Sequence, residues 1–177
     1  MRQLVKAIKL LIMAMILLLS SSCALYHNYG PHYGRIVDAE TKQPLEGAVV
    51  LAYYYTWLHA SPGGPAVYFL DAQEAVTDNK GEFRIPSLNA FAFRPISTFE
   101  SNPAFKIFKP RYKCYESGIP EDKYTTIRLR ELKTNEERIE NRCFPTSVAK
   151  RKMKRFIELQ NTESVDLGFQ PLPIGGD

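Results

Sequence analysis

The stretch GRIVDAETKQPLEGAVV, residues 34–50, decides how the rest of the chain is interpreted. Its first five residues have the pattern of a short strand, and Pro44 and Gly47 mark the polar segment after them as a turn. An apolar run rich in β-branched and aromatic residues then extends from Ala48 to Leu58. Such a run favours a central strand that is buried on both faces over its first half. The segment therefore predicts a β domain.

A second signal lies in AVTDNKGEFRIP, residues 75–86. Two strand-like segments, 74–77 and 82–86, flank a turn in which Asn79 and Gly81 tolerate a positive φ. We therefore expect these two segments to form a hairpin.

Further strand candidates follow the hairpin signal, and the last of them alternates apolar residues with arginines. Short strands about ten residues apart are typical of an antiparallel β-sandwich, here of about seven strands. The candidates are residues 104–108, 111–115 and 124–132.

The two quoted stretches together resemble the carboxypeptidase regulatory-like domain, a transthyretin-like sandwich. The matching positions are Gly34, Ile36, Asp38, Pro44, Leu45, Gly47, Ala48, Val50, Thr77, Asp78, Gly81 and Phe83. The resemblance covers residues 33–132 and implies a non-catalytic module that supports or assembles with other envelope proteins.

The chain begins with a basic segment and a short apolar run. Three cations precede the uncharged run Leu10–Leu19, and three serines follow it. Ten residues span about 15 Å as a helix, half of a hydrocarbon core. This layout predicts a secretory signal over residues 1–22.

Cys23 follows the serines directly, and this order resembles the lipobox of bacterial lipoproteins. The resemblance implies a diacylglycerol group on Cys23, a membrane anchor in the cell envelope and, because Ala24 follows, the outer membrane of a two-membrane cell. Simple secretion and an uncleaved anchor are the alternatives. Residues 23–32, interrupted by Gly30 and Pro31, are expected to form a tether.

The other two cysteines suit an exported chain. If Cys23 carries lipid, Cys114 and Cys143 remain as one candidate disulfide in an oxidising compartment. Two unrelated buried thiols are the alternative.

The C-terminal segment 133–177 has helical character and lies outside the resemblance. Thr134 and Glu137 form a capping box before one short helix. A second helix is expected from Thr146 to about Gln160, with one apolar stripe. The stripe consists of Ala149, Met153, Phe156, Ile157 and Gln160.

The net charge of +4 is concentrated rather than spread. Without the leader, 20 basic residues face 19 acidic ones, so nothing in the charge predicts a nucleic-acid partner. A basic cluster remains within six residues. It is either the solvated face of the second helix, or a contact with anionic lipid headgroups, or a site for a protein partner. Its members are Lys150, Arg151, Lys152, Lys154 and Arg155.

The stretch YYYTWLHASPGGPAVYF, residues 53–69, is the candidate binding surface for a glycan or a peptide. The alternative is that its aromatic residues fill the core. The residues singled out are Tyr53, Tyr55, Trp57 and Tyr68.

No catalytic or metal-binding motif is present in the sequence. The three histidines are His27, His32 and His59; the first two are expected to be solvated linker residues. We therefore expect no enzyme activity, no cofactor and no metal. The sequence predicts an anchored envelope module with a protein partner; a glycan- or peptide-binding module is the alternative, and an envelope hydrolase is disfavoured.

Overall fold

The computed structural model describes residues 3, 5–6, 8–13, 26–59, 63–93, 97–144 and 150–173. Cys23 and residues 145–149 lie outside this part of the chain. Within it, no helix has both the length and the apolar character needed to cross a bilayer.

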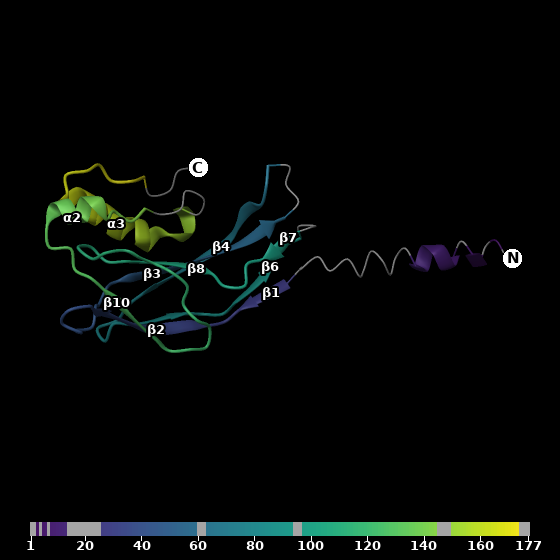
Figure 1. The fold of residues 1–177 in the computed structure, drawn as a ribbon, viewed down its shortest axis with the longest axis horizontal. Coiled ribbons are helices and arrows are strands. Elements are labelled where there is room, and N and C mark those ends of the chain that lie inside the picture. The colour runs from purple at the N-terminus through teal and green to yellow at the C-terminus, as the bar shows by residue number, and fades with distance from the viewer. Residues whose placement is uncertain are drawn as a thin grey trace.

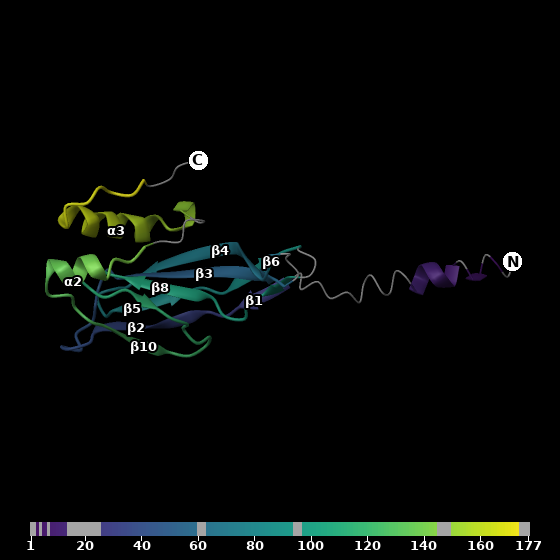
Figure 2. The same ribbon diagram turned by 45° about the horizontal axis from the view of Figure 1, so that its top comes forward.

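The described residues form a two-layer β domain with a helical extension on one outer face (Figures 1 and 2). The strands are β1 (Tyr26–Tyr29), β2 (His32–Asp38), β3 (Val49–Leu58), β4 (Ala66–Val76), β5 (Glu82–Ile85), β6 (Leu88–Phe91), β7 (Ser97–Phe99), β8 (Ala104–Phe108), β9 (Tyr115–Glu116) and β10 (Thr125–Leu129). The helices are α2 (Asn135–Glu140) and α3 (Lys154–Asp166), with a 3₁₀ turn η1 (Lys150–Lys152) before α3.

One layer has the strand order β4-β3-β8-β9, with β7 also paired to β3. The other has the order β10-β2-β5. The β1–β6 pair continues the β2–β5 pair in the same register, because Tyr29 faces Leu88 and His32 faces Ile85. The mainly β sandwich with a helical extension is thus confirmed, with one difference: β2 and β10 run parallel.

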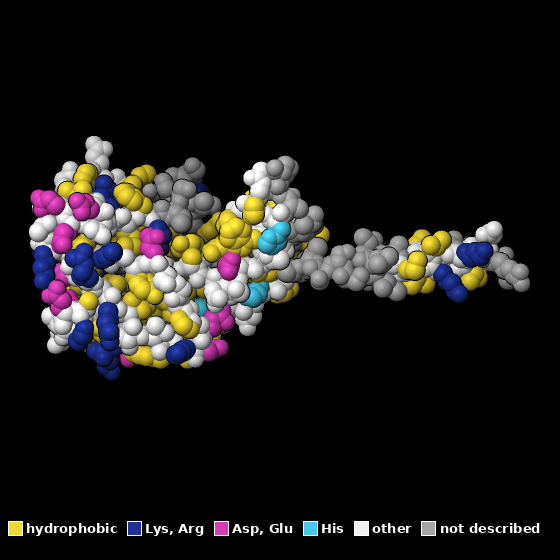
Figure 3. All heavy atoms as spheres, viewed as in Figure 1, with side chains coloured by type: hydrophobic (Ala, Val, Ile, Leu, Met, Phe, Trp, Pro, Cys, Tyr) yellow, Lys and Arg dark blue, Asp and Glu magenta, His cyan; other side chains and the backbone are white. Residues whose placement is uncertain are grey.

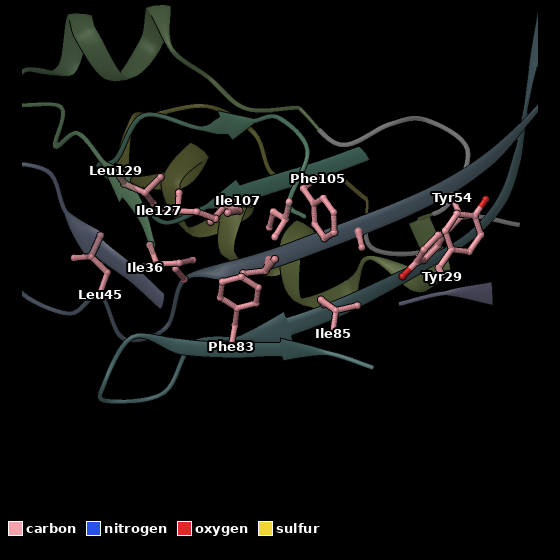
Figure 4. Close-up of a cluster of buried hydrophobic side chains, with 14 of the residues drawn as sticks. Tyr29, Ile36, Leu45, Tyr54, Phe83, Ile85, Phe105, Ile107, Ile127 and Leu129 are labelled. Atoms are coloured by element: carbon pink, nitrogen blue, oxygen red, sulfur yellow. The ribbon is translucent and has the colours of Figure 1, made fainter. Parts of the chain in front are cut away.

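The main core lies between the two layers, where alternate residues of each strand point inward (Figure 4). Ile36, Phe83 and Ile127 come from one layer and meet Phe105 and Ile107 of the other. The predicted alternation of the last strand is confirmed, since its apolar residues are buried and its arginines are exposed.

A second core holds α3 against the outer face of the β3 sheet. Val49, Leu51 and Phe108 pack there against Phe156 and Ile157. Met153 and Gln160 are buried as well, so the predicted apolar stripe is confirmed over the described residues; Ala149 and Thr146 lie outside them.

The N-terminus of α3 is capped from another element. The carboxylate of Glu74 in β4 accepts hydrogen bonds from the backbone N–H groups of Phe156 (2.9 Å) and Arg155 (3.1 Å). A helix N-terminus carries unsatisfied N–H groups and partial positive charge, so this carboxylate replaces the local cap that the sequence of α3 lacks.

The expected tether and the expected hairpin are both wrong in the described residues. The tether is folded from Tyr26 onward, since Tyr29 and His32 are fully buried and belong to β1 and β2. The expected hairpin does not form, because β4 pairs with β3 whereas β5 pairs with β2. The turn between them carries the chain from one layer to the other.

The candidate strand 111–115 is also mostly wrong. Arg111 has a φ of 69°, and only Tyr115 belongs to a strand, the two-residue β9. Tyr112 makes a single bridge to Glu131 instead. The turn at Arg111 breaks the extended pattern that the sequence suggested.

Candidate functional site

The candidate site is the outer face of β3 beyond the cover of α3. Alternate residues of this strand face outward, and the first two, Val49 and Leu51, lie under α3. The next three, Tyr53, Tyr55 and Trp57, are only half-buried. One stripe of large side chains is therefore covered at one end and accessible, as far as the described residues go, at the other.

These side chains line a shallow groove, which we call the aromatic groove. It has a volume of about 290 Å³. Figure 3 shows hydrophobic side chains gathered over the β3, β4 and β8 ribbons of Figure 1, beside the helical extension. The lining residues are Tyr53, Tyr54, Tyr55, Trp57, Val67, Phe69 and Ala104.

The rings of the groove are held in fixed positions relative to one another. The ring centroids of Tyr55 and Trp57 are 6.2 Å apart in an edge-to-face arrangement, and those of Tyr53 and Tyr55 are 6.4 Å apart. Trp57 donates its indole N–H to the carboxylate of Glu100. A rigid aromatic surface loses little side-chain entropy when it binds a partner.

The phenol groups of Tyr53 and Tyr55 in the groove are neutral at pH 7. Burial raises the pKa of both Tyr53 and Tyr55, and the nearby carboxylates Glu116 and Glu100 respectively raise it further. The hydroxyls therefore remain protonated hydrogen-bond donors and offer no phenolate for chemistry.

Tyr68 lies on the other side of the sheet from the groove. It pairs with Thr56 of β3, a buried residue of the inner face, whereas Phe69 pairs with Tyr55 and Val67 pairs with Trp57. Its inclusion in the predicted surface was wrong, and Val67 and Phe69 take its place.

The sulfur atoms of Cys114 and Cys143 are joined in a disulfide, and the Cα atoms are 5.6 Å apart. The bond connects the segment after α2 to the segment before β9, at the edge of the β3 sheet. Glu116 lies beside the sulfurs and forms an ion pair with Lys106 at 2.8 Å. A disulfide leaves no thiolate for a metal ion at this cluster.

The basic cluster lies along the start of α3 beside β4. Lys152 forms an ion pair with Asp71, and the guanidinium of Arg155 lies 4.0 Å from Glu158. Arg151 and Lys154 are exposed, while the side chain of Lys150 lies outside the described part. Lys150, Arg151 and Lys152 belong to η1 and the other two cations to α3, and all three alternatives for the cluster stay predictions.

The histidines are separated from one another. His27 stacks on Phe99 with ring centroids 5.5 Å apart, and His32 is fully buried with its ring edge against Phe105. His59 Nε2 lies 2.8 Å from Thr98 Oγ1. Two histidines that were expected in a solvated linker are therefore parts of the packed domain.

Sequence reasoning missed Ala104 and Glu100 as neighbours of the aromatic residues, whereas Val67 and Phe69 lie within the predicted stretch 53–69. Ala104 reaches the groove through the pairing of β8 with β3, and the side of the sheet on which Val67 and Phe69 lie depends on a register shift in the β3–β4 pair between Tyr54 and Tyr55. A period-2 pattern alone gives no sign of such a bulge.

Comparisons with known proteins add little to this geometry. No family model matches the chain, and no curated protein matches it. A solved structure, a 9R-lipoxygenase from Cyanothece PCC8801, matches 55% of this chain at 13% sequence identity with a TM-score of 0.26. The match spans 16% of the lipoxygenase chain. A likeness this weak carries no argument about fold or function.

Proposed function

We propose that this chain is a lipid-anchored protein of the cell envelope whose β-sandwich is a non-catalytic module for assembly with another protein. The observation that carries the assembly role is the aromatic groove, a rigid apolar surface that continues the covered face of β3. The leader and Cys23 carry the envelope location, with the outer membrane favoured.

The relation to the carboxypeptidase regulatory-like domain is part of this proposal, and the roles of the motif residues support it. The carboxylate of Asp38 accepts hydrogen bonds from the N–H groups of Glu40 (2.7 Å) and Thr41 (2.8 Å), and so fixes the first turn. Thr77 donates its hydroxyl to Leu45 O and accepts from Ala48 N–H, so the second motif holds the turn of the first.

Two motif glycines are required by close backbone contacts. A Cβ at Gly34 would lie 2.1 Å from the carbonyl oxygen of Thr125 in the parallel strand β10. Gly81 has a φ of 74°, and a Cβ there would lie 2.4 Å from the carbonyl oxygen of Ile36. Both positions therefore exclude every other residue without backbone movement.

The lining of the groove favours a protein over a glycan as the partner. Sugar recognition needs several convergent polar groups beside the rings, whereas the groove adds only the apolar Val67, Phe69 and Ala104 to its tyrosines and Trp57. The one indole N–H is already bonded to Glu100. Buried aromatic anchors in an apolar pocket are typical of protein–protein contacts.

We also propose that the module performs no catalysis. Within the described residues, none of the three histidines is hydrogen-bonded to a carboxylate, the pairing that general base catalysis uses. The nearest approach joins His32 Nε2 and Glu121 Oε1 at 4.0 Å, inside the packed domain.

Photo-crosslinking in intact cells tests the assembly role. A photoreactive residue at Val67, 53% exposed in the groove, is compared with one at Tyr68, 40% exposed on the opposite face. We expect a discrete protein adduct from position 67 only. A polysaccharide adduct at position 67 would indicate a glycan instead, and no adduct at either position would refute the docking role.

The mass of the mature protein tests the anchor separately. We expect a chain that begins at Cys23 and carries a lipid-sized mass increase. An unmodified chain in the soluble fraction would remove the anchor and leave the groove result to stand alone.

A further inference from the structure

A second group of exposed aromatic side chains lies at the end of the domain where the described β chain begins. Tyr26 is 72% exposed, Phe91 is 58% exposed and Phe93 is 69% exposed. Tyr26 and Phe91 face each other across the β1–β6 pair, with ring centroids 5.3 Å apart. We call these three residues the aromatic tip.

Few charged residues lie near the aromatic tip along the chain, and Arg94, directly after Phe93, is one of them. Residues 24–34 and residues 85–93 contain no Asp, Glu, Lys or Arg. In a chain in which 24% of residues are charged, both segments of this end are therefore neutral. Segments of this kind can approach a bilayer with few charges to remove from water.

The tip is very close to Cys23 in sequence. Three peptide units separate Cys23 from Tyr26, and a fully extended chain covers about 11 Å over that length. If Cys23 carries the lipid, as the proposed function holds, Tyr26 cannot lie farther than this from the backbone of the anchored residue. The headgroup region of a bilayer leaflet is itself several ångströms thick.

We propose that the aromatic tip lies in the headgroup region of the anchoring membrane and orients the whole domain on it. This inference rests on the proposed lipid anchor. Aromatic rings are enriched at membrane interfaces, where the apolar ring and a polar edge are both satisfied. The lipid and the three rings together give two attachments, which bind a membrane more stably than one lipid chain and restrict the tilt of the domain.

The proposed orientation separates the helical extension from the membrane. β1 and β6 lie at one end of the sandwich and α2 lies at the other (Figures 1 and 2). Lys154 lies at the start of α3, and the N–H of the next residue, Arg155, donates to Glu74, which pairs with Leu51 of β3. Leu51 is six residues from Trp57 along β3, roughly 20 Å at the rise of a strand. We therefore expect Lys154 to lie outside the headgroup layer, whereas Lys152, ion-paired with Asp71 beside Tyr54, lies nearer the tip.

Fluorescence from single labelled positions tests this orientation in the full lipidated chain, reconstituted in phosphatidylcholine–phosphatidylglycerol vesicles. An environment-sensitive dye is attached in the variant Phe93→Cys and, separately, in Lys154→Cys at the basic cluster. The paired Cys114 and Cys143 and the modified Cys23 leave the new thiol as the reactive one. Flotation of the vesicles measures the anchor independently of the dye.

We expect a blue shift and quenching by headgroup spin labels at position 93 and neither at position 154. A second substitution, Phe91→Ser, should reduce the quenching at position 93 by at least half, whereas Tyr68→Ser should leave it unchanged. Protein that floats but shows no quenching at position 93, or quenching at position 154 instead, would overturn the orientation while leaving the anchor intact. Protein that does not float would overturn both.

Discussion

Replacement of Gly34 by alanine tests the closest contact in the fold. The added Cβ would lie 2.1 Å from Thr125 O and 3.2 Å from a ring carbon of Phe83. The first obstacle is backbone, so it cannot turn aside as a side chain can. The parallel strands β2 and β10 must separate by more than about 1 Å to restore an ordinary carbon–oxygen contact.

The cost follows from that displacement. Overpacking in a rigid core costs about 1–3 kcal/mol, and each ladder hydrogen bond that lengthens adds about 1 kcal/mol. We therefore expect Gly34→Ala to lower the free energy of unfolding by about 3–5 kcal/mol. For a domain of this size, that corresponds to a fall in Tm of roughly 10 °C.

Two other glycines provide graded controls. Gly47 has a φ of 72°, and no atom lies within 4 Å of the position that a Cβ would take there, so alanine should cost only the left-handed backbone, about 1–2 kcal/mol. Gly118 has neither feature, and Gly118→Ala should change stability by less than about 0.5 kcal/mol.

Thermal melts and urea titrations followed by circular dichroism measure the series on the oxidised mature chain. The expected order of stability loss is Gly34, then Gly47, then Gly118. A Gly34→Ala variant that melts within about 2 °C of the parent would refute the close parallel approach of β2 and β10, and with it the physical role given to the first motif glycine.

Three further perturbations test the extension and the turns. Glu74→Ala should lower the free energy of unfolding by about 1–2 kcal/mol and speed amide hydrogen exchange at Phe156, because α3 loses its cap. Glu74→Gln should retain most of the protection of this amide against exchange. Burial raises the pKa of Glu74 above its usual 4.5, so the folded chain binds that proton more tightly. The Glu74 contribution to stability should therefore fall as pH rises from about 4.5, and this pH dependence should be absent in the Gln variant. The N–H of Thr41 holds the pKa of Asp38 below 3.8, so the stability that Asp38 adds should be present above pH 3.8 and disappear on acidification; equal pH profiles for the parent and Asp38→Asn would contradict this. Reduction of the disulfide, whose cysteines are 29 residues apart in sequence, should lower stability by about 3–4 kcal/mol in urea titrations with and without a reductant, and unchanged midpoints would contradict it.

Local signals predicted a large part of the fold. The turn at Asp38, the apolar run of β3 and the alternation of β10 are each encoded within a few neighbouring residues, and each is present in the structure. The cap of α2 is equally local, since Glu137 N–H donates to Thr134 Oγ1 at 3.2 Å.

The predictions are wrong where strand pairing or burial depends on residues that are distant in the sequence. The turn chemistry at Gly81 predicts a chain reversal but not which strands pair afterward, and β2 competes successfully for β5. Gly30 and Pro31 have the residue types of a linker. The burial of the neighbouring Tyr29 was not predicted, because it depends on Tyr54, whose ring centroid lies 4.6 Å away in the opposite layer.

In the candidate site, too, local features were predicted and features that depend on distant residues were not. Aromatic composition singled out Tyr55 and Trp57, but the face that Tyr68 occupies depends on the β3–β4 register shift. Glu74 gave no sign of its role because the helix end that it caps is about eighty residues later in the chain. Non-local hydrogen bonds of this kind leave no periodic pattern in a sequence.

The unbroken register from β1 into β2 also determines how the domain responds to tension. A pull on Tyr26 passes along β1 into β2, which lies between β5 and β10 and is the middle strand of its sheet. The ladder hydrogen bonds on both sides of β2 are perpendicular or slanted to the direction of that pull, so several of them must break together rather than one after another. The chain thus enters the domain in shear geometry, and its N-terminal end is the mechanically resistant one.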